Sequence, residues 1–296
     1  MDSFIDRIGK GEILIADGAT GTNLQAMGLK PGTPPEELVM DQPEMLLSLA
    51  EMFVEAGSDI ILTCTFGGTR LRMKESKYAD KPTEVNTRAV EIARKTAGKR
   101  AGVMVAGSMG PTGLLMKPFG PLEPELAREN YEEQARALAD GGVDLLVIET
   151  MFALDEADAA YNAARAVTNL PIVVSFSYDR GVRTMMGVKP ADMIRHYSEK
   201  GADVVGANCG SSLEHMEKVA QEYRTVELKM PLWIKPNAGL PHTEAGSNHS
   251  VYDVTPEMMA ASAVRYVTLG ARIVGGCCGT TPAHVAAISK AIKNML

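Results

Sequence analysis

The sequence lacks several features that would assign it to a specialised class of protein. It has no uninterrupted apolar run near the roughly 18 residues that cross a bilayer. Its first residues, Met-Asp-Ser-Phe-Ile-Asp-Arg, do not form the apolar stretch of a secretory signal. Positive charge is not in excess, because 30 Lys and Arg against 37 Asp and Glu give a net charge of −7. We therefore expect a cytoplasmic protein that binds neither nucleic acid nor a membrane.

Low-complexity tracts, linkers and a disulfide framework are also missing. The 296 residues are 45% hydrophobic and 23% charged, which is ordinary for a globular protein. A chain of this length buries a large core without disulfides or structural metals. We expect a single domain over residues 1–296. Its four cysteines are then either buried free thiols or metal ligands.

The sequence does contain a regular alternation of short apolar runs and longer helical patterns. Each run is almost continuously apolar, as in a parallel strand that is buried on both faces. The expected strands are Ile13–Asp17, Asp59–Thr63, Val103–Gly107, Asp144–Glu149, Ile172–Phe176, Asp203–Ala207, Leu232–Pro236 and Arg272–Gly275. The expected helices are Pro43–Ala56, Thr83–Ala97, Pro124–Ala139, Leu154–Val167, Pro190–Lys200, Ser212–Tyr223, Pro256–Leu269 and Pro282–Asn294.

Eight strands that alternate with eight helices predict an α/β fold, a single (β/α)8 TIM barrel. Four of the helices begin near a proline and end at Gly57, Gly141, Gly201 or Gly270, a common pattern of helix start and stop. The alternative is a doubly wound open sheet. It is disfavoured because no Gly-x-Gly-x-x-Gly turn follows the first strand.

The cysteines all fall where the active site of such a barrel would lie, at the carboxyl ends of strands. Cys64 follows the second strand, Cys209 the sixth, and the pair Cys277–Cys278 the eighth. Strands six and eight flank strand seven, so their backbones are expected roughly 10 Å apart. Three thiolates and one further ligand form a common tetrahedral zinc site. We expect the glycines that flank the pair to let the backbone bend there; the alternative is a set of buried, reduced thiols.

Other polar residues at the same strand ends are candidates for substrate binding. Glu149 ends an apolar strand and would need a cation if buried, either a substrate ammonium group or a lysine or arginine of the barrel. Asp17 either acts similarly or caps the following turn. The backbone amides of residues 18–21 and 108–110, which include Gly18 and Ser108, could receive a carboxylate. His242 and His249 lie in the loop after strand seven, where we expect them to be solvated.

Several of these stretches resemble the homocysteine S-methyltransferase family, most closely the homocysteine-binding barrel of cobalamin-dependent methionine synthases. They run in order along nearly the whole chain, and the most specific is Gly-Gly-Cys-Cys-Gly-Thr-Thr-Pro. They are residues 17–22, 110–113, 148–150, 208–210, 236–239 and 275–282.

The resemblance implies a zinc barrel in which the metal binds a thiol substrate as its thiolate, which is then methylated. It assigns Cys209, Cys277 and Cys278 as zinc ligands, with Asn237 as a fourth ligand that the substrate displaces. It agrees with an ammonium-binding role for Glu149. A thiolate-rich zinc site also suits alkyl transfer to sulfur better than hydrolysis. The implied reaction is methylation of homocysteine, or of a similar thiol, to methionine.

The methyl donor is expected to be a methylcorrinoid such as methylcobalamin, carried by a separate protein or a linked module. A quaternary ammonium donor such as betaine usually needs an aromatic cage, and the segment from Gly18 to Pro43 has no aromatic residue. The aromatic candidates at the barrel mouth are Phe66, Phe119, Phe152 and Tyr178, and they do not cluster in the sequence. The chain ends at Leu296, soon after the eighth expected helix.

Three alternatives remain open at this point. The chain could be a non-catalytic zinc- or thiol-binding barrel, a methyltransferase that uses betaine or S-methylmethionine, or a metal-free lyase with Glu149 as base. One departure bears on the acceptor, because methionine synthases usually read Thr-Asn-Thr-Phe at the end of strand two. This chain has Cys64 in place of that asparagine.

Overall fold

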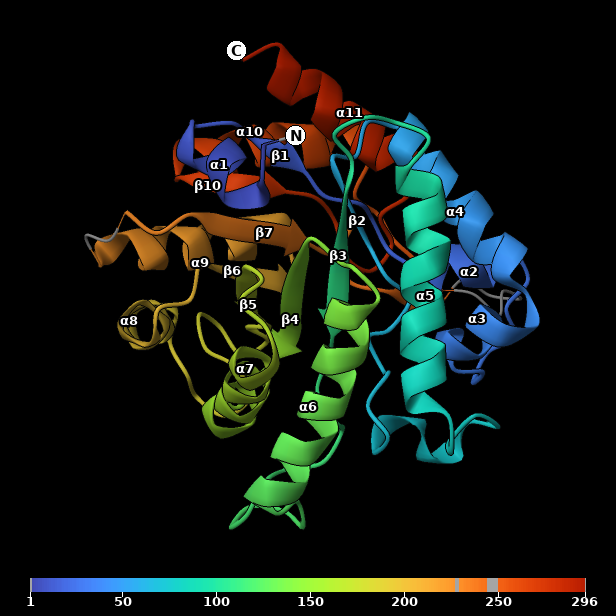
Figure 1. Ribbon diagram of the computed structural model, residues 1–296. Helices are drawn as coiled ribbons and strands as arrows, with labels where there is room; N and C mark the ends of the chain where they lie inside the picture. Colours follow the sequence, from blue (N-terminus) through green and yellow to red (C-terminus); the bar gives the residue numbers. More distant parts are fainter. Residues whose placement is uncertain (1, 227–228, 244–249, 296) are drawn as a thin grey trace.

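The computed structural model describes residues 2–226, 229–243 and 250–295. Its centre is a sheet of eight parallel strands in the order β1-β10-β7-β6-β5-β4-β3-β2. A parallel bridge between Ala16 and Ile60 joins the two end strands. The fold is therefore a single (β/α)8 barrel, as the sequence predicts (Figure 1).

The strands and helices alternate as expected, and every end lies within two residues of its predicted bound. The barrel strands are β1 (Leu14–Ile15), β2 (Ile60–Leu62), β3 (Met104–Met109), β4 (Leu145–Met151), β5 (Ile172–Phe176), β6 (Val204–Cys209), β7 (Leu232–Pro236) and β10 (Ala271–Val274). The helices around them are α4 (Pro43–Glu55), α5 (Pro82–Ala97), α6 (Pro124–Asp140), α7 (Leu154–Val167), α8 (Pro190–Lys200), α9 (Leu213–Thr225), α10 (Pro256–Thr268) and α11 (Pro282–Lys293).

Several short elements lie before the first strand or in the connections and were not expected from the sequence. They are too short to show a hydrophobic period. They are α1 (Phe4–Gly9), α2 (Gly21–Ala26), η1 (Pro35–Glu37), α3 (Leu38–Asp41), η2 (Arg72–Glu75) and the antiparallel pair β8 (His242–Thr243) and β9 (Ser250–Val251).

Glycines end the helices much as expected, with one correction. Gly57, Gly201 and Gly270 have φ of +107°, +78° and +93°, the left-handed conformation that stops a helix. After α6, Gly141 keeps a helical φ of −66°, and Gly142 at φ +90° makes the turn instead.

The barrel interior and the surrounding shell form two separate apolar clusters. The interior holds residues such as Leu14, Ala106, Val147 and Trp233, one or two from each strand. Because side chains alternate along a strand, the other set packs outward against the helices. This alternation decides which residues reach the mouth of the barrel.

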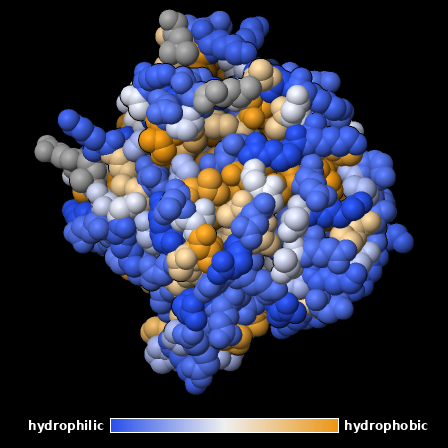
Figure 2. All heavy atoms as spheres, in the orientation of Figure 1, coloured by the Kyte–Doolittle hydropathy of each residue, from blue (hydrophilic) through white to orange (hydrophobic). Residues whose placement is uncertain are grey.

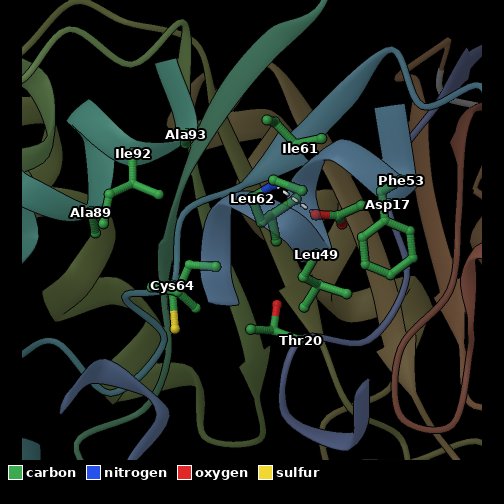
Figure 3. Close-up of a pocket in the computed structure, with 12 residues that line it drawn as sticks. Asp17, Thr20, Leu49, Phe53, Ile61, Leu62, Cys64, Ala89, Ile92 and Ala93 are labelled. Atoms are coloured by element: carbon green, nitrogen blue, oxygen red, sulfur yellow. Dashed lines mark hydrogen bonds between the residues drawn. The ribbon is translucent and has the colours of Figure 1, made fainter. Parts of the chain in front are cut away.

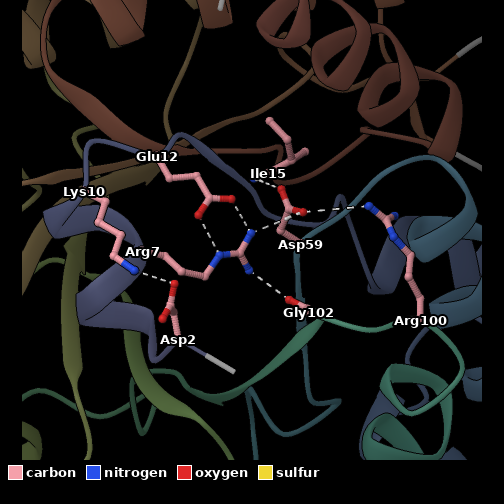
Figure 4. Close-up of polar contacts among 8 residues, drawn as sticks. All are labelled: Asp2, Arg7, Lys10, Glu12, Ile15, Asp59, Arg100 and Gly102. Atoms are coloured by element: carbon pink, nitrogen blue, oxygen red, sulfur yellow. Dashed lines mark hydrogen bonds and ion pairs between the residues drawn. The ribbon is translucent and has the colours of Figure 1, made fainter.

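Helix α1 closes the amino-terminal end of the barrel, because Phe4 and Ile8 belong to the interior cluster. Polar contacts hold this end together (Figure 4): Arg7 pairs with Glu12 at 2.5 Å and donates to the Gly102 carbonyl at 2.8 Å. Arg7 and Arg100 each lie 3.8 Å from Asp59. With this end plugged, the carboxyl end remains the one through which a ligand can enter.

The outer helices turn polar faces to solvent. The face shown in Figure 2 is largely hydrophilic, with hydrophobic residues in small groups. Within the part of the chain that the structure describes, no helix is long and apolar enough to span a membrane.

Candidate metal centre and substrate pocket

A layer of polar side chains lies above the apolar interior, at the carboxyl end of the barrel. Residues two or four positions beyond an interior residue on the same strand also point inward. This rule brings together one side chain from each of five neighbouring strands, all buried. They are Ser108 of β3, Glu149 of β4, Ser175 of β5, Asn208 of β6 and Lys235 of β7.

The thiols of Cys209, Cys277 and Cys278 form one cluster above this layer. Their sulfur atoms all lie within 4.8 Å of one another, and the Sγ atoms of Cys209 and Cys277 are 2.9 Å apart. Strands β6 and β10 both pair with β7, which brings the two segments together as the sequence predicts. Sulfurs on Zn–S bonds of about 2.3 Å lie about 3.8 Å apart in a tetrahedral site, so all three are near enough to share one ion, and Cys209 and Cys277 would separate slightly to bind it.

The backbone around the cluster is crowded rather than loose. A Cβ on Gly275 would come 2.9 Å from the carbonyl oxygens of Ala16 and Asp17, and one on Gly276 would come 2.3 Å from Thr280. Only Gly279, with φ +79°, has the conformation that the expected bend requires, and Tyr252 packs directly against it. Of the three flanking glycines expected to let the backbone bend, Gly279 has a left-handed φ, whereas Gly275 and Gly276 allow close packing.

The three thiols form hydrogen bonds with one another, which shift their pKa values in opposite directions. Hydrogen bonds with Cys277 and Cys278, together with burial, raise the pKa of Cys209 well above its usual value. Hydrogen bonds from Cys209 and Cys277 lower the pKa of Cys278 to about 3. One thiolate stabilised by two thiols is a cluster in which a cation can replace the remaining protons.

Asn237 lies beside the cluster, and its side-chain oxygen has no hydrogen-bond partner. Its N–H donates to the Cys209 carbonyl at 3.2 Å, and its side-chain amide donates to the Gly210 carbonyl at 2.9 Å. The side-chain oxygen is buried and has no hydrogen-bond partner. A buried orphan oxygen next to three thiols fits the fourth ligand of a metal ion.

Asn208, which the sequence reasoning did not single out, connects the cluster to the barrel. Its Oδ1 accepts from the Thr150 amide at 2.9 Å and the Ser175 hydroxyl at 2.7 Å. Its Nδ2 lies 3.6 Å from the Cys209 sulfur and 3.9 Å from the Cys277 sulfur. This side chain therefore orients the sulfurs from below.

Glu149 faces the same cavity and is held by one hydroxyl group. Ser108 donates to its Oε1 at 2.5 Å, which gives Ser108 a positioning role. Among the described residues, no lysine, arginine or histidine nitrogen lies within 4.0 Å of Glu149. Burial raises the pKa of Glu149 to about 7, although Lys235 and the Ser108 hydrogen bond act in the opposite direction.

Asp17 pairs with a buried cation of the barrel itself. Its Oδ1 lies 2.7 Å from the Nζ of Lys235, and both side chains are at most 6% exposed. Its Oδ2 accepts from the Leu62 amide at 2.8 Å. Burial opposes the charge on Lys235, but the carboxylates of Asp17 and Glu149 raise its pKa above the ordinary value. The sequence reasoning missed Lys235, which lies between Trp233 and Asn237 on β7.

The backbone amides considered for a carboxylate are partly occupied. The amides of Ala19 and Gly110 donate to the carbonyls of Thr280 and Phe66, and that of Ser108 donates to the Thr63 hydroxyl. A Cβ on Gly18 would come 2.7 Å from the Phe53 ring, so this glycine allows close packing at the pocket wall.

The cavity over this layer has a volume of about 440 Å³ and reaches the thiol cluster. Of the four expected aromatic candidates, Phe66 lines it, Phe119 is 69% exposed and Tyr178 is buried against Tyr223. The described lining is Gly18, Ala19, Thr20, Gly21, Thr22, Gln25, Pro35, Glu36, Leu62, Thr63, Cys64, Phe66, Ser108, Glu149, Thr150, Cys209, Lys235, Gly276, Cys277 and Cys278.

Cys64 also lines the cavity; it follows β2, which lies two strands from β10 around the closed barrel, so all four cysteines lie at one end of the barrel. Burial, with a smaller effect of Glu36, raises the pKa of its thiol well above the ordinary value. Glu36 is a buried carboxyl that the sequence reasoning missed; it accepts from the Gly67 amide at 2.6 Å. A smaller cavity of about 30 Å³ lies behind Cys64, against Leu49 and Ile61 (Figure 3).

Of the two histidines in the loop after β7, the structure describes His242, which does not line the cavity. His242 is 43% exposed and its Nδ1 lies 3.6 Å from Asp253. His249 lies outside the described residues.

The comparisons with known proteins agree with this geometry. A model of the homocysteine S-methyltransferase family matches residues 14–292. The methionine synthase of Mycobacterium tuberculosis is 29% identical over 304 residues, which cover 96% of this chain and 25% of that protein. The methionine synthase of Mycobacterium leprae is 29% identical over 302 residues, with 95% and 24% covered. The chain thus spans about a quarter of the length of these relatives.

Solved structures show the same fold at lower identity. The metallated form of the Escherichia coli homocysteine methyltransferase MmuM matches with a TM-score of 0.81 at 23% identity, covering 96% of this chain and 97% of that one. Its apo form matches with a TM-score of 0.73. The family model spans almost the whole chain, and the barrel that this chain forms carries the thiol cluster. This chain therefore belongs to the homocysteine S-methyltransferase family.

Proposed function

We propose that this chain transfers a methyl group to the sulfur of homocysteine, giving methionine, with a zinc ion held by Cys209, Cys277 and Cys278. The observation that carries the proposal is the cluster of three sulfurs within 4.8 Å, beside a buried carboxylate that has no ion-pair partner among the described residues. Asn237 would supply the fourth ligand before the substrate enters. Residues 1–296 act as one domain in this proposal.

A zinc ion at this position would hold the acceptor sulfur as a thiolate, the form that attacks carbon. The residues around it do the remaining work. Asn208 orients two of the ligand sulfurs from below, and Glu149 binds the ammonium group of the acceptor. The acceptor sulfur forms a bond to the methyl carbon, and the bond from that carbon to the donor breaks with its electron pair left on the donor.

We propose a methylcorrinoid as that donor, presented over the open mouth by a separate protein or a linked module. Phe66 is the one aromatic residue in the described lining of the cavity, too few for the cage that a quaternary ammonium donor usually needs. Free thiols such as these stay reduced in the cytoplasm, where we propose that the reaction takes place.

The test is a set of methyl-transfer assays with the zinc-loaded protein, homocysteine and one donor at a time. We expect turnover with methylcobalamin, and little with betaine or S-methylmethionine. Efficient turnover with betaine and none with methylcobalamin would overturn the donor. Binding of zinc and homocysteine without turnover from any donor would favour a non-catalytic thiol-binding barrel.

A further inference from the structure

A separate cavity lies at the amino end of the barrel, on the side away from the thiol cluster. It is bordered by α1, by the turn before β10 and by the segment before β7 (Figure 1). Its volume is about 600 Å³, a size typical of small-molecule pockets. The proposed methyl transfer takes place at the other end of the barrel and does not use this cavity.

Arg272 reaches the cavity from an irregular position in the sheet. Leu232 of β7 faces Ala271, and the next residue, Trp233, faces Ile273, so Arg272 is an extra residue on β10. A bulge of this kind re-aims a side chain, and bulges are rare between parallel strands. Among the described residues, the Arg272 side chain has neither a hydrogen-bond acceptor nor an ion-pair partner. The bulge therefore presents to the cavity a guanidinium group whose five donors no described residue uses.

A second guanidinium group lies beside the first. Arg224 donates to the carbonyls of Leu269 and Gly270, in the turn directly before β10. A Cβ on Gly270 would come 1.9 Å from the Nη2 of Arg224, so glycine at this position lets the arginine lie against the turn. Burial and the nearby charge of Arg272 lower the pKa of Arg224. The two like charges repel each other, and an anion in the cavity would relieve this repulsion.

Positive charge exceeds negative charge in the described lining. Lys229 adds a third cation, and among the described residues its side chain has no hydrogen bond or ion pair. Asp203 is the one carboxylate in that lining, and it already pairs with Arg165 and accepts from the Ile172 amide at 2.9 Å. A ligand with two negative charges would therefore complement this cavity better than a neutral one.

The rest of the lining is largely apolar. Helix α1 contributes Ile5, which is 39% exposed, and Ile8. Met230 and Pro231 add to this surface from the segment before β7. An isoleucine that stays exposed beside the cations fits a ligand with an apolar body and an anionic end.

We propose that this cavity binds an organic phosphate, with the phosphate group at Arg272 and Lys229 and the apolar body against Ile5. A guanidinium group matches two phosphate oxygens with parallel donors. A purely structural role explains Arg272 less well, because an arginine that only held the turn would bond to its carbonyls, as Arg224 does.

The test is calorimetry of the full chain with three probes at about pH 7.5, where a phosphate monoester is mainly a dianion. Phenyl phosphate carries both groups, inorganic phosphate lacks the apolar body, and phenol lacks the charge. We expect one phenyl phosphate per chain, bound more tightly than either of the other probes. Arg272→Gln should weaken it about tenfold or more, since charge-assisted hydrogen bonds become neutral ones. Lys229→Gln should weaken it by a smaller factor.

Arg195→Gln is the matched control, because it removes the same charge from α8, where Arg195 pairs with Asp192 outside the cavity. It should leave the phenyl phosphate affinity within about twofold. Lys229 is exposed, so its variant decides if Arg272→Gln does not fold.

Three results would overturn the inference. They are no binding of phenyl phosphate to the wild type, unchanged binding in both Arg272→Gln and Lys229→Gln, and phenol or inorganic phosphate binding as tightly as phenyl phosphate. None of these results bears on the proposed methyl transfer, which the assays with homocysteine test separately.

Discussion

Cys209 carries its sulfur on a left-handed backbone, with φ +60°, and Thr150 has the same conformation, with φ +61°. Such conformations cost about 1–2 kcal/mol for a residue with a side chain. Asn208 offsets part of this cost, because it accepts from the Thr150 amide and donates to the Thr150 hydroxyl. The strained residues at the ends of β4 and β6 thus support one another beside the thiol cluster.

Replacing Cys277 and Cys278 by alanine together should reduce bound zinc from about one ion per chain to nearly none. Structural zinc in thiolate sites needs its full ligand set, and two of three are removed. Metal analysis of the purified variant checks this, with the single variant Cys64→Ala as control, since Cys64 lies outside the cluster. Full zinc occupancy in the double variant would contradict the ligand assignment.

Replacing Asn208 by alanine should weaken zinc binding by about 10- to 100-fold, because residues that orient metal ligands contribute in that range. Competition with a chelator measures the change. Ser177→Ala is a suitable control: this buried serine donates to Asp179, away from the cluster. An unchanged zinc affinity in Asn208→Ala would show that the contacts of Asn208 with the sulfurs do not contribute to zinc binding.

The charge of Glu149 should make the metal-free protein less stable as the pH rises from about 4.5 to about 7. Burial raises its folded pKa to about 7 from 4.5, so in this window the folded chain keeps a proton that the unfolded chain loses. That loss amounts to about 3 kcal/mol in the free energy of unfolding. Urea unfolding at pH 5 and pH 8 measures it; Glu149→Gln should lack this component. The same pH dependence in both proteins would contradict it.

At the level of single residues, the sequence predicts the ligand cysteines but not their supports. The three ligand cysteines are evident because thiols are few and all fall at strand ends. Lys235 and Asn208 give no such signal, since lysine and asparagine are common residues. Both stand at inward positions near the carboxyl end of an apolar strand. Counting every second residue along the strand from Trp233 or Val204 would have identified them.

At the scale of elements, the spacing of β6 and β7 positions both the thiol cluster and the polar layer. Gly206 makes this spacing possible, because a Cβ there would lie 2.1 Å from the Trp233 carbonyl oxygen. Gly206→Ala should therefore lower the free energy of unfolding by about 3 kcal/mol, through overpacking in the barrel interior.

Gly9→Ala is the matched control for this substitution, since a Cβ at Gly9 would have no atom within 4 Å. Its effect should stay within about 0.5 kcal/mol. Denaturant unfolding of both variants gives the comparison. Equal stability of Gly206→Ala and wild type would mean that the two strands can move apart without cost.

The long helices and strands can be predicted from the sequence because their hydrophobic periods are clear. The structure of the connections cannot be predicted in this way. The segment between β1 and α4 folds into α2, η1 and α3 and brings Glu36 over the pocket. Its contacts depend on distant partners, such as the Gly67 amide, and no local pattern encodes them. The same is true of Tyr252, which packs on Gly279 from the loop after β7.

For the molecule as a whole, the apolar core does not include the thiol cluster. The interior and shell clusters lie below and around the thiols, and none of the three ligand cysteines belongs to either. Removal of the metal by a chelator should therefore leave the helical circular dichroism signal unchanged and abolish thiol binding. Loss of the helical signal together with the metal would show that the ion is needed for folding.

The seam between β1 and β2, where the barrel closes, has few backbone contacts of its own. β1 has two residues, and two carboxylates replace missing ladder partners: Asp59 accepts from the Ile15 amide and Asp17 from the Leu62 amide (Figures 3 and 4). Amides held by side chains open with smaller fluctuations than amides inside a continuous ladder. In hydrogen–deuterium exchange, the amides of Ile15 and Leu62 should therefore exchange well before those of β4 and β5, which means that the barrel opens locally at the seam between β1 and β2. Asp17 at this seam pairs with Lys235 in the cavity wall, so a bound acceptor should slow the exchange of the seam amides.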